Sequence, residues 1–546
     1  MLMVQVSAKK GLQMFGERAA LAIITEFRQL HDKAVFQPIG INTVSIADRR
    51  KALRAITLVQ EKRCGKIKGR TVADGSSQRS YINSEDAASP TVSLEALMLT
   101  AAIDATERRD VATADISGAF LQADIDELVL VVFEGVMVDL LLKTDPIYKK
   151  YVHINKQGKK ILYVKLTKAM YGCMKAARLF YENLATQLIS MGFTINPYDL
   201  CTANKIIDGH QCTIVWHVDD LKISHIDPNT VTKVIKTLED KYGEMSVTRG
   251  RRHTYVGVNF NFEPDGTVEI EMKDYLKECI KDFPEEITHS TSTPAALHLF
   301  EVNDNTIKLT PEKMEIFHKI VAKLLFACKR SRPDIQTTVA FLTTRVSKSD
   351  EDDWKKLKRC LQYLHSTIDL TLTLSAENMT IIKWWVDASY AIHKDMKSHT
   401  GAAMSLGRGI IYGKSAKQKL NTKSSTEAEV VGVSDVSSQI FWTLYFLMEQ
   451  GYDVVENRLY QDNKSSILLE KNGKLSSGQR TRHMNIRYFF IKDRVDKEEV
   501  NIVYCPTEHM VGDFFTKPLQ GKMFIAFRNK ILGIDPNPEF IQERVE

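Results

Sequence analysis

The sequence predicts an α+β protein built from several domains. The chain has 546 residues, 44% of them hydrophobic, which is enough for about three to five folded units. Strand-like and helical stretches alternate along it, and two groups of carboxylates follow predicted strand ends. We expect an N-terminal helical segment, a first α+β unit, a linker, a helical connection, a second α/β unit and a tail, at residues 1–54, 55–282, 283–311, 312–377, 378–525 and 526–546.

In the first half of the chain, apolar side chains at helical spacing over 13–31 predict an amphipathic helix. Short strands follow from about 55 to 73, and Ser89-Pro90 then opens a helix over Ser93–Thr106. The remaining elements expected there are strands at 128–133 and 161–166, a helix over 167–190, a helix over 230–242, and strands near 254–262 and 267–272.

In the second half, Pro, Ser and Thr residues mark 283–311 as a linker. The stretch 312–366 is helical, with an interruption at Pro333. From about 378 we expect strands, a long helix from Ser425, further strands near 457–461 and 499–504, and a terminal helix. An apolar helix near 439–448 is too short to cross a bilayer, so no membrane partner is expected.

Charge and cysteine usage exclude some classes of protein. A net charge of +6 is a mild excess that does not by itself indicate nucleic acid. The eight cysteines form no Cys-x-x-Cys pair and no Cys/His zinc spacing, so neither a disulfide framework nor a zinc module is expected. We therefore expect an intracellular, reducing location.

The first carboxylate group consists of Asp115 at a strand end and the Asp219-Asp220 pair between two apolar stretches. The pair is expected at a hairpin turn, where two neighbouring anions repel unless a cation shares them. Two Mg²⁺ (or Mn²⁺) ions held by the three carboxylates could activate a 3′-hydroxyl and neutralise a leaving pyrophosphate. Taken alone, the pair is also typical of a solvated turn, and the spacing would suit a hydrolase too.

The second carboxylate group lies downstream. Asp387 ends a strand that begins with two tryptophans, and Asp462 ends another strand. Glu427 and Glu429 follow Ser424 and Ser425 at a capped helix start, and Asp513 is expected to open the last helix. Glu427 also suits an acid at a helix N-terminus that the helix dipole favours.

Several motifs occur in the order found in copia-type LTR retrotransposon Pol polyproteins. They are Asp115-x-x-x-Ala119-Phe120-Leu121, Leu166-x-Lys168-Ala169-x-Tyr171-Gly172, Asn196-Pro197-x-Asp199 and Val218-Asp219-Asp220. The chain resembles the reverse transcriptase and ribonuclease H portion of these polyproteins over about residues 12–528. The resemblance implies a fingers–palm–thumb polymerase, a helical connection and an α/β ribonuclease H-like domain.

The resemblance also implies two metal ions in each of two sites. In the polymerase the ligands would be Asp115, Asp219 and Asp220. In the ribonuclease H they would be Asp387, Glu429, Asp462 and Asp513. We choose Glu429 over Glu427 because the apolar residues that follow it match the family pattern.

Further residues are implied as substrate contacts. Phe120 would lie under the incoming sugar and oppose a ribose 2′-OH, and Arg70 would grip the triphosphate. Tyr255 and Gly257 would support the primer. Lys175 stands where the family often has a nucleotide-contacting Gln, and could reach a phosphate as a point charge.

The function implied is an RNA-directed DNA polymerase with a fused ribonuclease H. Its substrates would be an RNA template, a DNA primer, deoxynucleoside triphosphates and the RNA/DNA hybrid, and the element's capsid and integrase proteins would be partners. The location would be the cytoplasm, in retrotransposon particles, with access to the nucleus. The alternative is a decayed or co-opted element that binds nucleic acid without catalysis, for which Lys175 and His217, where the family often has Tyr, are the supporting departures.

Overall fold

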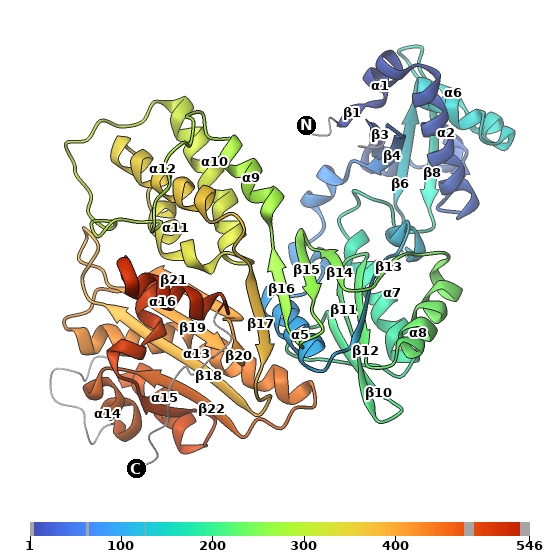
Figure 1. Cartoon of the computed structure of the whole chain (residues 1–546). Coiled ribbons are helices and arrows are strands. Elements are labelled where there is room, and N and C mark those ends of the chain that lie inside the picture. The colour runs from blue at the N-terminus through green and yellow to red at the C-terminus, as the bar shows by residue number, and fades with distance from the viewer. Residues whose placement is uncertain (1–4, 62–64, 126, 474–484, 535–546) are drawn as a thin grey trace.

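In the part of the chain that the structure describes, helices pack against four β-sheets, which confirms the expected α+β class (Figure 1). The computed structural model describes residues 5–61, 65–125, 127–473 and 485–534. Residues 535–546 of the predicted C-terminal tail lie outside this part of the chain. The predicted domain boundaries stay predictions.

The first sheet has seven strands and is formed by the N-terminal part of the chain. Its strands are β1 (Gln5–Ser7), β3 (Leu53–Glu61), β6 (Leu130–Glu134), β8 (Lys160–Leu166) and β2 (Phe36–Ile39), with β4 (Ile67–Ala73) beside β3 and β7 (His153–Ile154) beside β8. Its helices are α1 (Ala8–Phe15), α2 (Glu17–Asp32), α3 (Ile46–Lys51) and α6 (Val136–Leu142). The helix expected over 13–31 is confirmed over α2 and the end of α1, but Gly16, with a positive φ of 53°, separates the two helices.

The second sheet has six strands. They run in the order β13 (Ser246–Arg249), β5 (Asp110–Asp115), β12 (Asp220–His225), β11 (His210–His217), β10 (Thr202–Ile207) and β9 (Thr194–Ile195). The helices of this part are α4 (Ser84–Ala87), α5 (Leu94–Thr106), α7 (Ala176–Ser190) and α8 (Pro228–Tyr242). The helix expected over Ser93–Thr106 is confirmed, and Ser93 caps it, since its hydroxyl accepts the backbone N–H of Ala96 at 3.1 Å.

The helix expected over 167–190 begins only at Ala176, so its first nine residues were predicted wrongly. Gly172 has a φ of +92°, and a Cβ there would lie 2.0 Å from the carbonyl oxygen of Ala73. The backbone N–H of Ala73 also donates to the Tyr171 carbonyl at 2.7 Å. This segment is therefore a turn packed backbone-to-backbone on the end of β4, which only glycine permits.

The third sheet joins the two halves of the chain. Its strands are β14 (Arg252–Tyr255), β15 (Val258–Phe262), β16 (Val268–Glu271), β17 (Leu372–Ala376) and β20 (Gly407–Arg408). β16 and β17 lie side by side between the halves in Figure 1, paired antiparallel although about 100 residues of chain separate them. The helices between them are α9 (Lys273–Lys281), α10 (Pro311–Cys328), α11 (Gln336–Thr343) and α12 (Glu351–Ser366).

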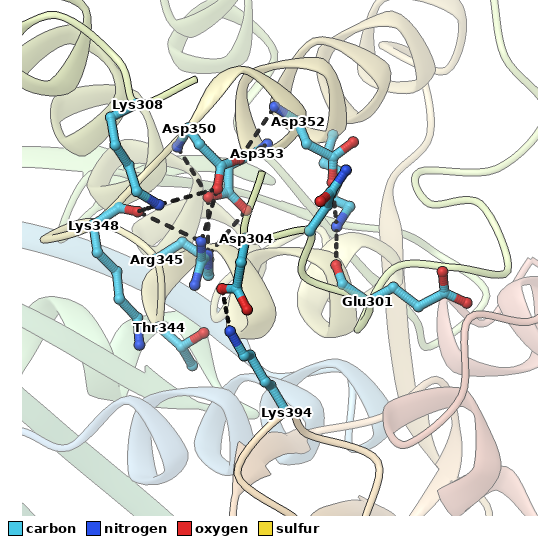
Figure 2. A network of polar contacts seen from close by, with 12 residues as sticks. Glu301, Asp304, Lys308, Thr344, Arg345, Lys348, Asp350, Asp352, Asp353 and Lys394 are labelled. Carbon is cyan, nitrogen blue, oxygen red and sulfur yellow. Dashed lines mark hydrogen bonds and ion pairs between the residues drawn. The ribbon is translucent and has the colours of Figure 1, made fainter. Parts of the chain in front are cut away.

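The segment before α10 is tied to the helices by a polar network rather than left as a free linker (Figure 2). The buried Arg345 guanidinium donates to the carboxylates of Asp353, at 2.9 Å, and of Asp350, at 3.0 Å. Those two residues form the capping box of α12. Asp304 in the segment pairs with Lys394, which follows β18. The network therefore connects the helical region to the C-terminal sheet.

The fourth sheet has five strands, β21 (Tyr412–Lys417), β19 (His399–Ser405), β18 (Ile381–Ser389), β22 (Glu456–Gln461) and β23 (Asn501–Tyr504). β18, β22 and β23 pair in parallel, while β18, β19 and β21 pair antiparallel. The helices of this part are α13 (Ser425–Glu449), α14 (Lys464–Asn472), α15 (Asn485–Asp496) and α16 (Gly521–Ile531).

Helix α13 confirms the long helix expected from Ser425, and it includes the apolar stretch at 439–448. Its 25 residues are long and apolar enough to cross a membrane by length and composition, but 67% of the apolar window is buried inside the fold. A core helix of a globular protein has these properties too. One hydrophobic core includes α5, the third sheet, the helices α10–α12 and the C-terminal sheet, while a second core lies under the first two sheets.

Candidate active sites

The first carboxylate group lies at one end of the second sheet. β11 and β12 form a hairpin whose two loop residues are Val218 and Asp219, with His217 paired to Asp220 across the loop. Val218 has a φ of +60°, a conformation that a β-branched residue rarely adopts. Such strain costs on the order of 1–3 kcal/mol and is typical of functional sites. The sequence thus predicted the hairpin but not its strained residue.

The sheet register brings the predicted ligands together. Asp115, the last residue of β5, is directly opposite Asp220, and the backbone N–H of Ile116 donates to the Asp219 carbonyl at 3.0 Å. Residues directly opposite each other in an antiparallel pair share one face of the sheet. Burial raises the pKa of Asp220, and the charges of Asp219 and Asp115 raise it further. Three mutually repelling carboxylates at one edge are the oxygen ligands that Mg²⁺ prefers.

Tyr255 lies beneath this hairpin rather than on the surface. Its side chain is buried, and its hydroxyl donates to the carbonyl oxygens of Asp220 at 3.0 Å and Val215 at 3.3 Å. The packing of β14 turns the ring inward, so this side chain supports the hairpin of the carboxylates, and the expected role of residues 255–257 in supporting the primer stays a prediction. Gly257, with a φ of +75°, lies in the two-residue turn that connects β14 to β15.

Three side chains form a stack, which we call the aromatic stack, near the carboxylates. The guanidinium of the exposed Arg70 lies 4.1 Å from the ring centre of Tyr171, and that ring lies 4.7 Å from the ring centre of Phe120. Burial raises the pKa of Tyr171, and the charges of Asp219 and Asp115 act in the same direction, so the stack borders the carboxylate group. The sequence predicted Arg70 and Phe120 as contacts but missed Tyr171 between them.

Lys175 is engaged elsewhere. Its ammonium group forms an ion pair with Glu127 at 3.1 Å, and the residue precedes the first turn of α7. In the motif Tyr171-Gly172-Cys173-Met174-Lys175, the residue that belongs to the aromatic stack is Tyr171. The structure thus gives no support to Lys175 as a phosphate contact.

The second carboxylate group is compact. Oxygens of Asp387, Asp462 and Asp513 all lie within 4.8 Å of one another. Asp387 is on β18 and Asp462 follows β22, so the parallel pairing of these strands aligns them. Asp513 lies in a 3-10 turn over Val511–Phe515, which corrects the expectation that it opens the last helix.

A glycine brings that turn close to the sheet. Gly401 of β19 is directly opposite Asp387, and a Cβ at Gly401 would lie 2.6 Å from the carbonyl oxygen of Gly512. Any larger residue would therefore push the turn, with Asp513, away from Asp387. Thr516 donates its hydroxyl to Asp387, and the Lys517 ammonium is 2.6 Å from Asp513.

Raised pKa values at the second carboxylate group indicate that its negative charges are only partly compensated by nearby positive charge. Burial raises the pKa of Asp513 to about 7, with the Asp387 charge as the next cause. The pKa of Asp462 is raised by the same two causes, and Thr507 donates to it at 3.2 Å. Lys517 compensates only part of the charge, which favours a bound cation.

Glu429 suits the fourth position better than Glu427. Burial, followed by the charges of Asp387 and Asp462, holds the pKa of Glu429 well above its usual range, and its Oε2 has no hydrogen-bond partner in the described part of the chain. Glu427 instead accepts the backbone N–H of Lys423 at 2.7 Å, as an acid in the first helical turn does.

A further acid, Glu470 of α14, was not singled out from the sequence. It is completely buried, accepts the Ser466 hydroxyl at 3.1 Å, and its charge acts on Glu429. Burial raises the pKa of Glu470 to about 8. An acid at helical spacing in an amphipathic helix gives no sequence signal of burial, since most such acids are exposed.

Comparison with known proteins shows which family the chain resembles. Residues 42–296, which include the first carboxylate group and the aromatic stack, match the family model described as "Reverse transcriptase (RNA-dependent DNA polymerase)". The chain is 25% identical over 481 residues to the Pol polyprotein of transposon TNT 1-94 of Nicotiana tabacum. Over most of its length it is similar to copia/Ty1-type retrotransposon Pol polyproteins.

Other relatives agree with this copia/Ty1-type assignment. The Pol polyprotein of transposon RE2 of Arabidopsis thaliana is 26% identical over 85% of the chain, and the Ty1-LR2 Gag-Pol polyprotein of Saccharomyces cerevisiae is 23% identical over 88%. The chain spans only about a third of these relatives, from 27% to 34% of their length.

Among solved structures, a foamy viral protease–reverse transcriptase in complex with double-stranded DNA is similar in fold. The likeness covers 88% of this chain and 68% of the viral chain, with a TM-score of 0.50 and 12% identity. It therefore supports the α+β multidomain fold of this chain and carries no residue assignments.

The reverse transcriptase family implies divalent metal ions, and the residues here fit them. Both groups offer hard carboxylate oxygens, and the second also has the unpartnered, buried Oε2 of Glu429 beside its three aspartates. Ions bound there would satisfy that oxygen and offset the repulsion that raises the pKa of Asp513.

Proposed function

We propose that the chain copies RNA into DNA at the first carboxylate group and degrades RNA in the resulting hybrid at the second. The observation that supports polymerisation best is the strand register that places Asp115 opposite Asp220. Asp219 lies beside them, in the strained loop that connects β11 to β12. The substrates would be an RNA template, a DNA primer and deoxynucleoside triphosphates. Accordingly, we assign the first sheet to the fingers, the second to the palm and α10–α12 to the connection or thumb.

In the polymerase site, Asp115, Asp219 and Asp220 would hold the metal ions. Two divalent ions would supply activation of the primer hydroxyl and neutralisation of pyrophosphate. Arg70, exposed and oriented by the Tyr171 ring, would bind phosphate oxygens of the nucleotide. Phe120, whose ring centre lies 4.7 Å from that of Tyr171, would exclude a ribose 2′-OH. Tyr255 would fix the hairpin from below.

In the second site, Asp387, Glu429, Asp462 and Asp513 would hold two metal ions for attack of water on an RNA phosphodiester. The compact aspartate triplet and the unpartnered Glu429 oxygen support this role. Lys517 would orient Asp513 through their 2.6 Å ion pair. We also assign the parallel–antiparallel C-terminal sheet to a ribonuclease H-like domain.

The polymerase proposal is tested by primer extension on an RNA template with Mg²⁺. We expect the purified chain to extend a DNA primer and Asp220→Asn to abolish extension. Asp208→Asn is the matched control, because Asp208 is exposed in the turn at the opposite end of the same sheet. Extension by Asp220→Asn at the rate of the parent would refute the assignment.

The ribonuclease H proposal is tested on a preformed RNA/DNA hybrid. Asp387→Asn should abolish RNA cleavage and leave primer extension intact, while Asp453→Asn, at an exposed position before β22, should cleave normally. Unchanged cleavage by Asp387→Asn would show that the degradation comes from elsewhere.

We also propose an intracellular location and the element's capsid and integrase as partners. The similarity to copia/Ty1-type Pol polyproteins supports these proposals. Seven cysteines of the described chain are free thiols and buried, as suits a reducing compartment. Co-sedimentation of the chain with element RNA in particles from expressing cells would test both, and its recovery only outside such particles would contradict them.

A further inference from the structure

The Asn196-Pro197-Tyr198-Asp199 motif has a structural role that the two active sites do not use. Asp199 shapes the loop, since its carboxylate accepts the backbone N–H groups of Ser93 at 2.9 Å and Cys201 at 3.1 Å. Asn196 is buried at 2% exposure and lies just beyond β9. Its side-chain amide is aimed at the C-terminal half of the chain.

The motif contacts the C-terminal end of α13. Nδ2 of Asn196 donates to the carbonyl of Phe446 at 3.1 Å, and Nε1 of Trp442 donates to the carbonyl of Tyr198 at 2.8 Å. The rings of Tyr198 and Tyr445 lie 5.4 Å apart. Phe446 is within the last turn of α13, and its carbonyl also accepts the backbone N–H of Gln450 at 2.9 Å, so Asn196 supplies a second donor to it. Residues 196–198 are therefore hydrogen-bonded directly to the C-terminal end of α13.

A second group of contacts strengthens the same junction. Gln211 of β11 donates to the carbonyl of Gln450, which caps α13. Arg109, nearly buried, donates to the Tyr452 hydroxyl at 3.1 Å, and that hydroxyl donates to Glu107 at 2.6 Å. These groups lie at the start of β5 and on β11, the strands that bear Asp115 and lead into the Asp219 loop.

The other end of α13 carries Glu429. From Glu429 to Phe446 is 17 residues of continuous helix, or about 26 Å at 1.5 Å per residue. One rigid element thus connects the second carboxylate group to the sheet that holds the first.

We propose that this junction positions the two active sites at a fixed separation, so that RNA is cut at a set distance behind the growing DNA end. The junction consists of Asn196–Asp199 and of residues 442–452, which lie at the end of α13 and just beyond it. Asn196 is then a positioning residue, which touches no substrate. The inference rests on the proposed function, since it requires both activities on one hybrid.

Two variants test the junction, each removing one hydrogen-bond donor. Asn196→Asp replaces the Nδ2 donor by an oxygen that repels the Phe446 carbonyl, and Trp442→Phe removes the donor to Tyr198 but keeps a ring. Asn229→Asp is the control, at an exposed position on α8. The assay extends an end-labelled DNA primer on an RNA template labelled at its 5′ end and maps RNA cuts against the DNA terminus.

For the parent and the control we expect cuts within a window of a few nucleotides at a constant distance from the DNA end. In both junction variants this window should broaden at least twofold, while primer extension alone and cleavage of a preformed hybrid each stay within twofold of the parent. An unchanged window in both variants would overturn the inference. So would loss of extension in Trp442→Phe, because the junction would then stabilise the polymerase region itself. Absence of either activity in the parent would instead refute the proposed function.

Discussion

Glu470 makes a specific prediction about stability and pH. The residue is fully buried in α14, and burial raises its pKa from 4.5 to about 8. Because the folded state holds the proton more tightly than the unfolded state, this group's contribution to stability is fully present below pH 4.5 and is lost as pH rises to about 8. One pKa unit corresponds to about 1.36 kcal/mol. The parent should therefore lose roughly 4 kcal/mol from this group between pH 5 and pH 8.

Glu470→Gln isolates that contribution. Glutamine has nearly the same shape, keeps an oxygen for the Ser466 hydroxyl and cannot ionise. Urea unfolding of parent and variant is followed by tryptophan fluorescence, to which Trp384, Trp385 and Trp442 of the C-terminal part contribute. The variant's free energy of unfolding, relative to the parent's, should rise by roughly 4 kcal/mol from pH 5 to pH 8 and level off above pH 8.

The exposed Glu449 provides the control, and Glu449→Gln should follow the parent at every pH. Taking the difference between two variants cancels all groups that titrate alike in both. A constant difference between Glu470→Gln and the parent across this range would refute the reasoning, because it would mean that Glu470 ionises as readily in the folded protein as in the unfolded chain.

Three further substitutions have expected outcomes. Gly401→Ala should cost about 1–3 kcal/mol and reduce hybrid cleavage more than extension, because its Cβ would lie 2.6 Å from the Gly512 carbonyl. Tyr171→Leu removes the ring at the centre of the aromatic stack, and the KM for nucleotide in primer extension should rise roughly tenfold. Tyr255→Phe removes the donor to the Asp220 carbonyl, which costs about 1–3 kcal/mol and should lower kcat for extension.

Each of these has a matched comparison. Gly432→Ala, within α13, meets only ordinary contacts of 3.5 Å and should be tolerated. Lys175→Ala should leave the nucleotide KM nearly unchanged, and a larger effect than in Tyr171→Leu would restore Lys175 as a contact. Tyr163→Phe, on β8, should extend normally. A normal kcat in Tyr255→Phe would show that the hairpin holds its shape without that hydroxyl.

Local chemistry explains which features were predictable from the sequence. The helix over Ser93–Thr106 was predicted because its start signal and its composition are local properties. A cluster of Asp115, Asp219 and Asp220 was expected, but the strand register that places Asp115 directly opposite Asp220 is a long-range property that was not predicted.

Features that depend on distant backbone were missed. The turn before α7 exists because Gly172 meets Ala73, about 100 residues earlier, and Asp513 sits in a 3-10 turn because Gly401 lets it approach β19. The stacking of Tyr171 between Arg70 and Phe120 joins three separate segments. None of these contacts leaves a periodic pattern in the chain.

The pairing of β17 with β16 has a consequence for dividing this protein. β17 belongs by sequence to the second half, yet it completes a sheet begun by β14–β16 and also pairs with β20. Cutting the chain before Leu372 would leave β16 with an open edge, a common start for aggregation. The halves are therefore poor candidates for separate expression or for exchange with those of a relative, and a swap that preserves this sheet would need to place its joint beyond Arg408.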